Sequence, residues 1–246
     1  TFGDDAKTVA NILGIVLTSR NNGGSDIPLA GFPYHSLDLY LPRLVRAGFR
    51  VAICEQLEKP SKEKKIVDRG VTDIVTPGLV VTDSLLDKKS NNFLASIHFT
   101  AKNIHGLSLI DISTGEFLVT ETDTEGLTKL IDSFQPSEII YAKGFHSFAD
   151  ELFGNRYYLY AIEDWIFSYD FARDKILDNF RVQNLKGFGI EEMEMSQIAA
   201  GSVLYYLTAT QNKKVEHLVS IQRIQSEEFV WLDRFTIRNL ELVDCI

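Results

Sequence analysis

A group of basic side chains lies between positions 43 and 69 of this 246-residue sequence, where eight Lys and Arg residues stand against four Asp and Glu residues. The formal net charge of the whole chain is −9. Residues 1–80 carry ten basic and nine acidic residues, net +1, whereas residues 81–246 carry 15 and 25, net −10. A locally basic segment on an acidic protein indicates a phosphate-contacting domain attached to scaffold domains. A normal solvated loop is an equally good interpretation of the lysines between 59 and 65.

Other groups that could do chemistry are sparse. Cys54 in an apolar run and Cys245 near the end form no disulfide framework, and we expect Cys54 to be a buried thiol. The five histidines have no partner at metal-ligand spacing, so no zinc site is expected. The sequence has no Gly-x-x-x-x-Gly-Lys-Ser/Thr loop for a nucleotide. It also has no apolar run of about 18 residues and no signal peptide, so we expect no membrane span and a cytoplasmic protein.

The stretch 27–56, IPLAGFPYHSLDLYLPRLVRAGFRVAICEQ, combines several unusual local choices. Two prolines near its start exclude helix there. Apolar residues then recur at helical spacing, with Ser36 as the predicted N-cap and Gly48 as the predicted stop. Pro42 lies inside this pattern and predicts a kink or a break. An ordinary helix packed on a strand accounts for the spacing of the apolar residues but not for the specific order of residues in 27–56.

That string resembles the N-terminal mismatch-recognition domain of the MutS family of DNA mismatch repair proteins. Seven further segments resemble the family in collinear order: Phe2–Ala6, Leu13–Arg20, Ile74–Gly78, Asn91–Ala95, Leu109–Phe117, Asn184–Ile190 and Leu232–Leu242. The resemblance implies four parts. These are a mismatch-recognition domain at 1–80, a linker at 81–92, a connector domain at 93–230, and the start of the core (lever) domain at 231–246.

The order of predicted elements gives the fold class, which is α/β. Residues 4–13 and 37–47 are predicted helices, and 14–19, 49–57 and 66–76 predicted strands, so the first domain is small and mixed α/β. In the second domain three strands with turns between them predict an antiparallel meander. Helices and strands then alternate up to residue 210. This order predicts a three-layer α/β/α connector with the ribonuclease-H-like topology that the resemblance implies.

Seven residues are candidates for DNA contact because of the resemblance. Thr18, Ser19 and Arg20 end the strand that runs beside the mismatch in the family, and its neighbouring loop holds Leu29, Tyr34 and His35. Arg69 matches a basic position on the last strand of the domain. Contacts to minor-groove sugar and phosphate are what the resemblance implies. Asp73 matches a position that is often basic in relatives, so one phosphate contact could be displaced.

The family reads a mispair with a Phe-x-Glu motif that lies immediately before the residues matching Thr1 and Phe2. Those two reading residues are absent from this sequence, so we expect it to be a fragment that binds DNA weakly and without mismatch preference. Phe2 itself is predicted to be a core contact of the first helix. The family's ATPase lies outside this chain, so no enzyme activity, catalytic residue or cofactor is expected here.

The resemblance implies mismatched double-stranded DNA as ligand, a MutL-type partner on the connector, and a homodimer that uses ATP and Mg in the full-length protein. Two alternatives stay open. The connector could be a protein-interaction scaffold alone. A ribonuclease-H-like nuclease would need carboxylates that converge on a metal, and Asp111, Glu163 and Asp164 are the candidates. The first connector strand, however, carries no carboxylate.

Overall fold

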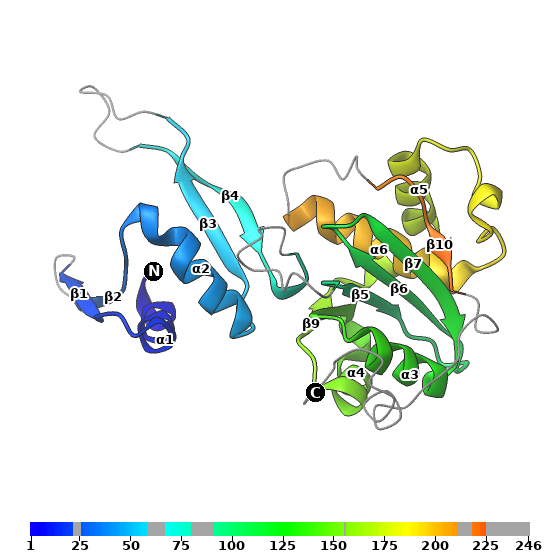
Figure 1. Cartoon of the computed structure of the whole chain (residues 1–246), viewed down its shortest axis with the longest axis horizontal. Helices are drawn as coiled ribbons and strands as arrows, with labels where there is room; N and C mark the ends of the chain where they lie inside the picture. Colours follow the sequence, from blue (N-terminus) through cyan, green and yellow to red (C-terminus); the bar gives the residue numbers. More distant parts are fainter. Residues whose placement is uncertain (22–25, 59–66, 80–90, 155, 211–217, 225–246) are drawn as a thin grey trace, which may run out of the picture.

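A computed structural model describes residues 1–21, 26–58, 67–79, 91–154, 156–210 and 218–224 of the chain. Figure 1 shows a slender N-terminal body (blue to cyan) beside a larger layered body (green to orange). The N-terminal body contains α1 (Gly3–Leu13), β1 (Thr18–Asn21), β2 (Asp26–Leu29), a 3-10 turn (Tyr34–Ser36), α2 (Leu37–Arg46), β3 (Val51–Gln56) and β4 (Arg69–Val75). It is mixed α/β, as the sequence predicts.

The first helix, α1, buries one face and ends where its sequence predicts. Ala6, Ala10 and Leu13 are buried, and Gly14 at φ 68° ends the helix by donating its N–H to the Ala10 carbonyl. That left-handed conformation is open to glycine at little cost. Phe2, however, is 58% exposed, so its predicted core contact is wrong. It forms an isolated antiparallel bridge with Leu29 instead.

The second helix, α2, is continuous from Leu37 to Arg46 although Pro42 lies inside it. Of the kink or break predicted at Pro42, the break is therefore wrong and the kink stays a prediction, and the proline ring is buried with Leu41, Leu44 and Val45. Ser36 is the N-cap residue of α2, as the sequence predicts, although its side chain makes no capping hydrogen bond. Gly48 follows the helix at φ 85°, which confirms the predicted glycine stop.

Two antiparallel ribbons complete the N-terminal body. In the first, β1 pairs with β2; in the second, β3 pairs with β4 across an irregularity at Ile53 and Cys54. The strand predicted at 14–19 is displaced, because Val16 and Leu17 are exposed and pairing begins at residue 18. Cys54 is exposed, so its predicted burial is wrong. A two-stranded ribbon covers one face only, and alternate side chains of β3 therefore meet solvent.

In the described residues, the larger body contains six strands and four α-helices. They are β5 (Leu94–His98), β6 (His105–Asp111), β7 (Glu116–Thr122), α3 (Thr124–Phe134), β8 (Glu138–Ala142), α4 (His146–Phe153), β9 (Leu159–Ile162), α5 (Tyr169–Phe180), α6 (Glu194–Thr210) and β10 (Gln222–Arg223). The strand order is β10-β7-β6-β5-β8-β9.

The pairing of these strands confirms the predicted topology. Strands β5, β6 and β7 form an antiparallel meander, whereas β8 and β9 lie parallel to β5. The parallel neighbours are joined by crossover helices, α3 before β8 and α4 before β9. This is the ribonuclease-H-like arrangement. The short β10, parallel to β7, is an addition that the sequence did not predict.

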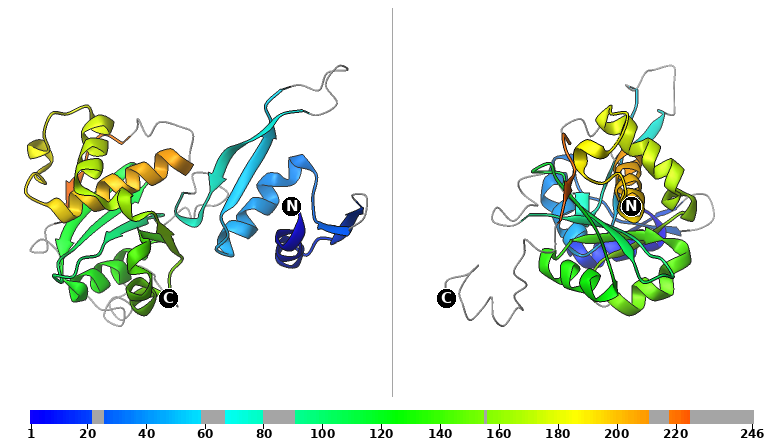
Figure 2. Two further views of the ribbon diagram at one scale, coloured as in Figure 1. Left: turned by 180° about the vertical axis from the view of Figure 1, so that it is seen from behind. Right: turned by 90° about the vertical axis from the view of Figure 1, so that its right-hand side faces the viewer.

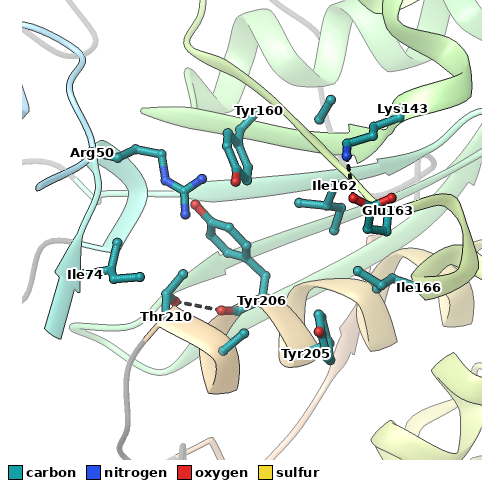
Figure 3. A pocket seen from close by; sticks show the side chains of 12 residues that line it. Arg50, Ile74, Lys143, Tyr160, Ile162, Glu163, Ile166, Tyr205, Tyr206 and Thr210 are labelled. Carbon is teal, nitrogen blue, oxygen red and sulfur yellow. Dashed lines mark hydrogen bonds and ion pairs between the residues drawn. The ribbon is translucent and has the colours of Figure 1, made fainter. Parts of the chain in front are cut away.

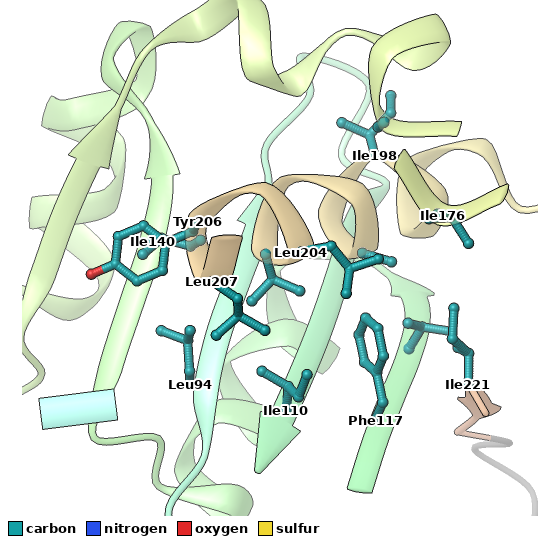
Figure 4. Close-up of a cluster of buried hydrophobic side chains, with 14 of the residues drawn as sticks. Leu94, Ile110, Phe117, Ile140, Ile176, Ile198, Leu204, Tyr206, Leu207 and Ile221 are labelled. Atoms are coloured by element: carbon teal, nitrogen blue, oxygen red, sulfur yellow. The ribbon is translucent and has the colours of Figure 1, made fainter. Parts of the chain in front are cut away.

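The sheet is the middle of three layers. Helices α5 and α6 (yellow to orange) cover one face and α3 and α4 (green) cover the other, as Figures 1 and 2 show. Each interface has its own core, and Figure 4 shows the side under α6, where Leu204 and Leu207 meet Leu94, Ile110 and Phe117. These cores make the larger body a firm support for the smaller one.

Two predicted regions lie outside the described residues. The start of the core domain, 231–246, is wholly outside, and the linker, 81–92, is described only at 91–92. Among the described residues, no helix is both long enough and apolar enough to cross a membrane.

Candidate nucleic-acid interface

The β1–β2 ribbon holds four of the seven candidate residues together. Thr18, Ser19 and Arg20 are all exposed on β1, and the register places Leu29 of β2 opposite Thr18. The Thr18 hydroxyl donates to the Leu29 carbonyl at 3.0 Å. Just past Leu29, the Ala30 N–H donates to the Thr1 carbonyl at 3.1 Å and so ties the ribbon to the chain before α1. The ribbon therefore presents side chains outward from a supported base.

Arg20 is the cation of this ribbon. It lies opposite Ile27 in the register, and no ion pair joins it to another residue in the part of the chain that the structure describes. An exposed guanidinium without a protein carboxylate is available for a phosphate group, which it can bind through two hydrogen bonds.

The other three candidates, Tyr34, His35 and Arg69, lie on the 3-10 turn before α2 and at the start of β4. Tyr34 and His35 are exposed in the 3-10 turn before α2, and the Tyr34 hydroxyl donates to Glu55 Oε1 at 3.3 Å. Arg69 is exposed and lies opposite Gln56, the neighbour of Glu55. Sequence reasoning missed Glu55, since no local pattern links positions 34 and 55. The structure thus places four candidates on the β1–β2 ribbon, two on the turn before α2 and one on β4, and their contact with DNA stays a prediction.

The basic segment 43–69 is less free than its charge indicates. The Arg43 guanidinium donates to the Leu13 and Ile12 carbonyls at 3.1 and 3.4 Å, where it binds the end of α1. Arg50 lies over the Tyr160 ring at 3.5 Å and points to the connector. The four lysines between 59 and 65 lie outside the described residues. Two of the eight cations therefore have structural roles.

The carboxylates considered for a nuclease have local roles. Asp111 is buried and accepts hydrogen bonds from the Ser113 N–H at 2.8 Å and the Asn92 N–H at 3.0 Å, which fixes the turn after β6. Glu163 forms an ion pair with Lys143, and Asp164 accepts from the Gly144 N–H. Across the described ranges, no three His, Cys, Asp or Glu side chains gather where they could hold a metal ion. The geometry gives the nuclease alternative no support.

Comparison with known proteins assigns the two bodies. The family model described as MutS domain I matches residues 1–84, and the one described as MutS domain II matches residues 92–219.

Full-length relatives agree with this assignment. The DNA mismatch repair protein MutS of Cytophaga hutchinsonii is 54% identical over 245 residues, 99% of this chain and 28% of the relative. Those of Christiangramia forsetii and Bacteroides fragilis are 52% and 46% identical over 242 and 244 residues, again with 28% of each relative covered. The chain thus spans about 28% of the length of these relatives. With both domain models matched in order, the chain belongs to the MutS family and carries its domains I and II.

Proposed function

We propose that residues 1–80 bind duplex DNA as part of the mismatch-recognition domain of a mismatch repair protein and that residues 93–230 connect this domain to the rest of that protein. The observation that carries the proposal is the β1–β2 ribbon, in which every residue of β1 is exposed, Arg20 included. It lies in the segment that matches MutS domain I. Its face offers hydroxyl, guanidinium and apolar side chains together, the mixture that contacts sugar, phosphate and a widened groove.

The connector has a different character. The part of the chain from 81 to 246 has a net charge of −10, which disfavours contact with phosphate groups. We assign the DNA to the N-terminal body and a MutL-type protein partner to the connector. In the full-length protein, a homodimer would clamp the DNA in the cytoplasm and ATP and Mg would act elsewhere. This chain itself would hold no cofactor and catalyse no reaction.

Salt-dependent binding of the 246-residue chain tests the proposal. Fluorescence anisotropy with a paired duplex and with a duplex containing one mispair gives affinity at several salt concentrations. Arg20→Ala and Arg69→Ala should each reduce the slope of log affinity against log salt by about one unit, because one phosphate contact is lost. The two duplexes should weaken nearly equally, since phosphate contacts carry no information on pairing.

Lys102→Ala supplies the matched control, because Lys102 is an exposed cation on a connector turn and should leave the slope unchanged. Equal slopes for the wild type and both arginine variants would refute the assignment of these residues. If the wild-type chain binds no duplex at low salt, the interaction-scaffold alternative is favoured. The same titrations compare the affinities for the mispaired and the paired duplex. We expect the ratio of these affinities to be less than about tenfold, roughly 1.4 kcal/mol.

A further inference from the structure

Among the described residues, hydrogen bonds and ring contacts at three places join the N-terminal body to the connector, and we call this set the joint. On the N-terminal side it comprises Arg46, Gly48, Arg50, Thr76 and Gly78; on the connector side it comprises Glu138, Tyr158, Tyr160 and Tyr206. The first place is the chain exit itself. There the Thr76 hydroxyl and the Gly78 N–H donate to Glu138 Oε2 of β8, at 2.5 and 3.1 Å.

The contacts at the chain exit fix the position of the N-terminal body but not its orientation, because a domain attached at one place can rotate about that place. The other two places lie away from the exit and remove that freedom. The Tyr158 hydroxyl donates to the Arg46 carbonyl at 3.3 Å. Its ring lies so close to Gly48 that a Cβ there would be 2.0 Å from a ring carbon. Arg50, on the loop before β3, supplies the third place.

The Arg50 guanidinium carbon lies 3.5 Å from the centre of the Tyr160 ring and 5.5 Å from that of Tyr206. Figure 3 shows the guanidinium facing both rings across the joint. Its Nε is buried and has no hydrogen-bond partner, and among the described residues no carboxylate forms an ion pair with it. The rings are therefore the main electrostatic partner of this cation.

Apolar packing does little to hold the two bodies here. The space beside Arg50 is an open hollow of about 230 Å³, bordered by Ile74 of β4 and by Ile162 and Ile166 of the connector. Interfaces of this kind between domains allow relative motion unless they are large and apolar. Beyond the chain exit, where Leu79 is buried in the connector core, the contacts of Tyr158 and Arg50 therefore bear on the orientation of the N-terminal body.

We propose that Arg50 is a positioning residue for DNA binding: stacked on Tyr160, it fixes the direction in which residues 1–76 project from the connector. This rests on the proposed function. Arg50 itself does not contact DNA, and it acts by holding the N-terminal body, with its two ribbons, in one orientation relative to the connector. Losing the stack should broaden that orientation and lower duplex affinity by about three- to thirtyfold, the range of one partly buried cation–π contact.

The test measures orientation and DNA binding separately in the 246-residue chain. Spin labels on Cys54, exposed on β3, and on Ser133→Cys, exposed on α3, report the distance between the bodies in a Cys245→Ser background. Arg50→Met keeps the stem and removes the charge. Tyr160→Leu keeps an apolar side chain and removes the ring, whereas Tyr160→Phe retains the ring and should restore wild-type behaviour.

Arg156→Met is the matched control, because Arg156 lies 5.6 Å from the Tyr157 ring wholly within the connector. Circular dichroism checks that each variant is folded. We expect Arg50→Met and Tyr160→Leu to broaden the distance distribution and weaken duplex binding, and Tyr160→Phe and Arg156→Met to do neither.

Several results would overturn the positioning role. Unchanged distances in Arg50→Met would do so, as would broadened distances with unchanged affinity. Lower affinity with unchanged distances would mean that Arg50 contacts DNA itself. A wild-type chain that binds no duplex would refute the proposed function instead, and the distances would still decide whether Arg50 fixes the orientation.

Discussion

Replacing Glu138 by leucine should lower the free energy of unfolding more than any surface substitution does. Three buried hydrogen-bond donors would remain in place without the acceptor that they now share. Glu138 is 2% exposed at the start of β8. Its carboxyl group accepts from the Thr76 hydroxyl, the Gly78 N–H and the Tyr206 hydroxyl, the last at 2.5 Å. Burial, and then the negative charge of Glu138, raises the pKa of Tyr206, which therefore stays a donor.

The magnitude follows from the three donors. Each buried donor left without an acceptor costs about 1–3 kcal/mol, so with three donors Glu138→Leu should lower the free energy of unfolding by about 3–9 kcal/mol. With a urea dependence of about 2 kcal/mol per molar, the unfolding midpoint should fall by about 1.5–4.5 M. Tyr206→Phe should cost less in the Glu138→Leu background than in the wild type, because it removes a hydroxyl that has already lost its acceptor.

Urea unfolding followed by circular dichroism and tryptophan fluorescence measures both effects. Glu125→Leu is the matched control, since Glu125 is exposed in α3 and its ion pair with Lys129 should contribute less than about 1 kcal/mol. A midpoint for Glu138→Leu within the error of the Glu125→Leu midpoint would refute the reasoning. So would equal costs of Tyr206→Phe in the two backgrounds.

Three further predictions concern other parts of the chain. Gly106→Ala should destabilise by about 2–3 kcal/mol in urea unfolding, because its Cβ would lie 1.9 Å from the Met195 carbonyl oxygen, whereas Gly187→Ala, in open space, should not. Burial, then the charge of His105, lowers the pKa of His98 from 6.5 to about 4, so stability should fall as pH drops through that interval. Between pH 6.5 and pH 4, the melting temperature should fall less in His98→Phe than in the wild type. An equal fall in both proteins would contradict this. Asp73→Arg should strengthen duplex binding and steepen its salt dependence in anisotropy titrations; unchanged affinity at low salt would show that β4 does not face DNA.

Local patterns in the sequence predicted most elements of the connector. Alternating apolar residues and clear turn signals gave the meander, and 17-residue α6 is long enough for its type to be unambiguous. The start of β1 was missed because the apolar run 15–17 resembles a buried strand, although Val16 is 77% exposed. Exposure of Cys54 was missed for a related reason, since a lone ribbon leaves one face uncovered.

The joint could not be predicted from the sequence. Arg50 and Tyr160 are 110 positions apart, and neither has a local feature that marks its partner. Arg50 was instead grouped with the basic segment 43–69, since charge alone does not show that a cation stacks on a distant ring. The role of Glu138 could not be predicted either, because the groups that donate to it lie far away in the sequence, at positions 76, 78 and 206.

Photo-cross-linking from the β1–β2 ribbon tests most directly whether this face contacts DNA. A photoreactive side chain at Thr18 or Ser19 samples both faces of β1, because successive side chains of a strand point in opposite directions. The same group at Ser133, exposed on α3, serves as the reference. With a duplex containing one mispair at low salt, we expect a cross-link from position 18 or 19 and none from 133. A cross-link from 133 alone, or equal cross-linking from all three positions, would contradict the assignment of this ribbon to DNA.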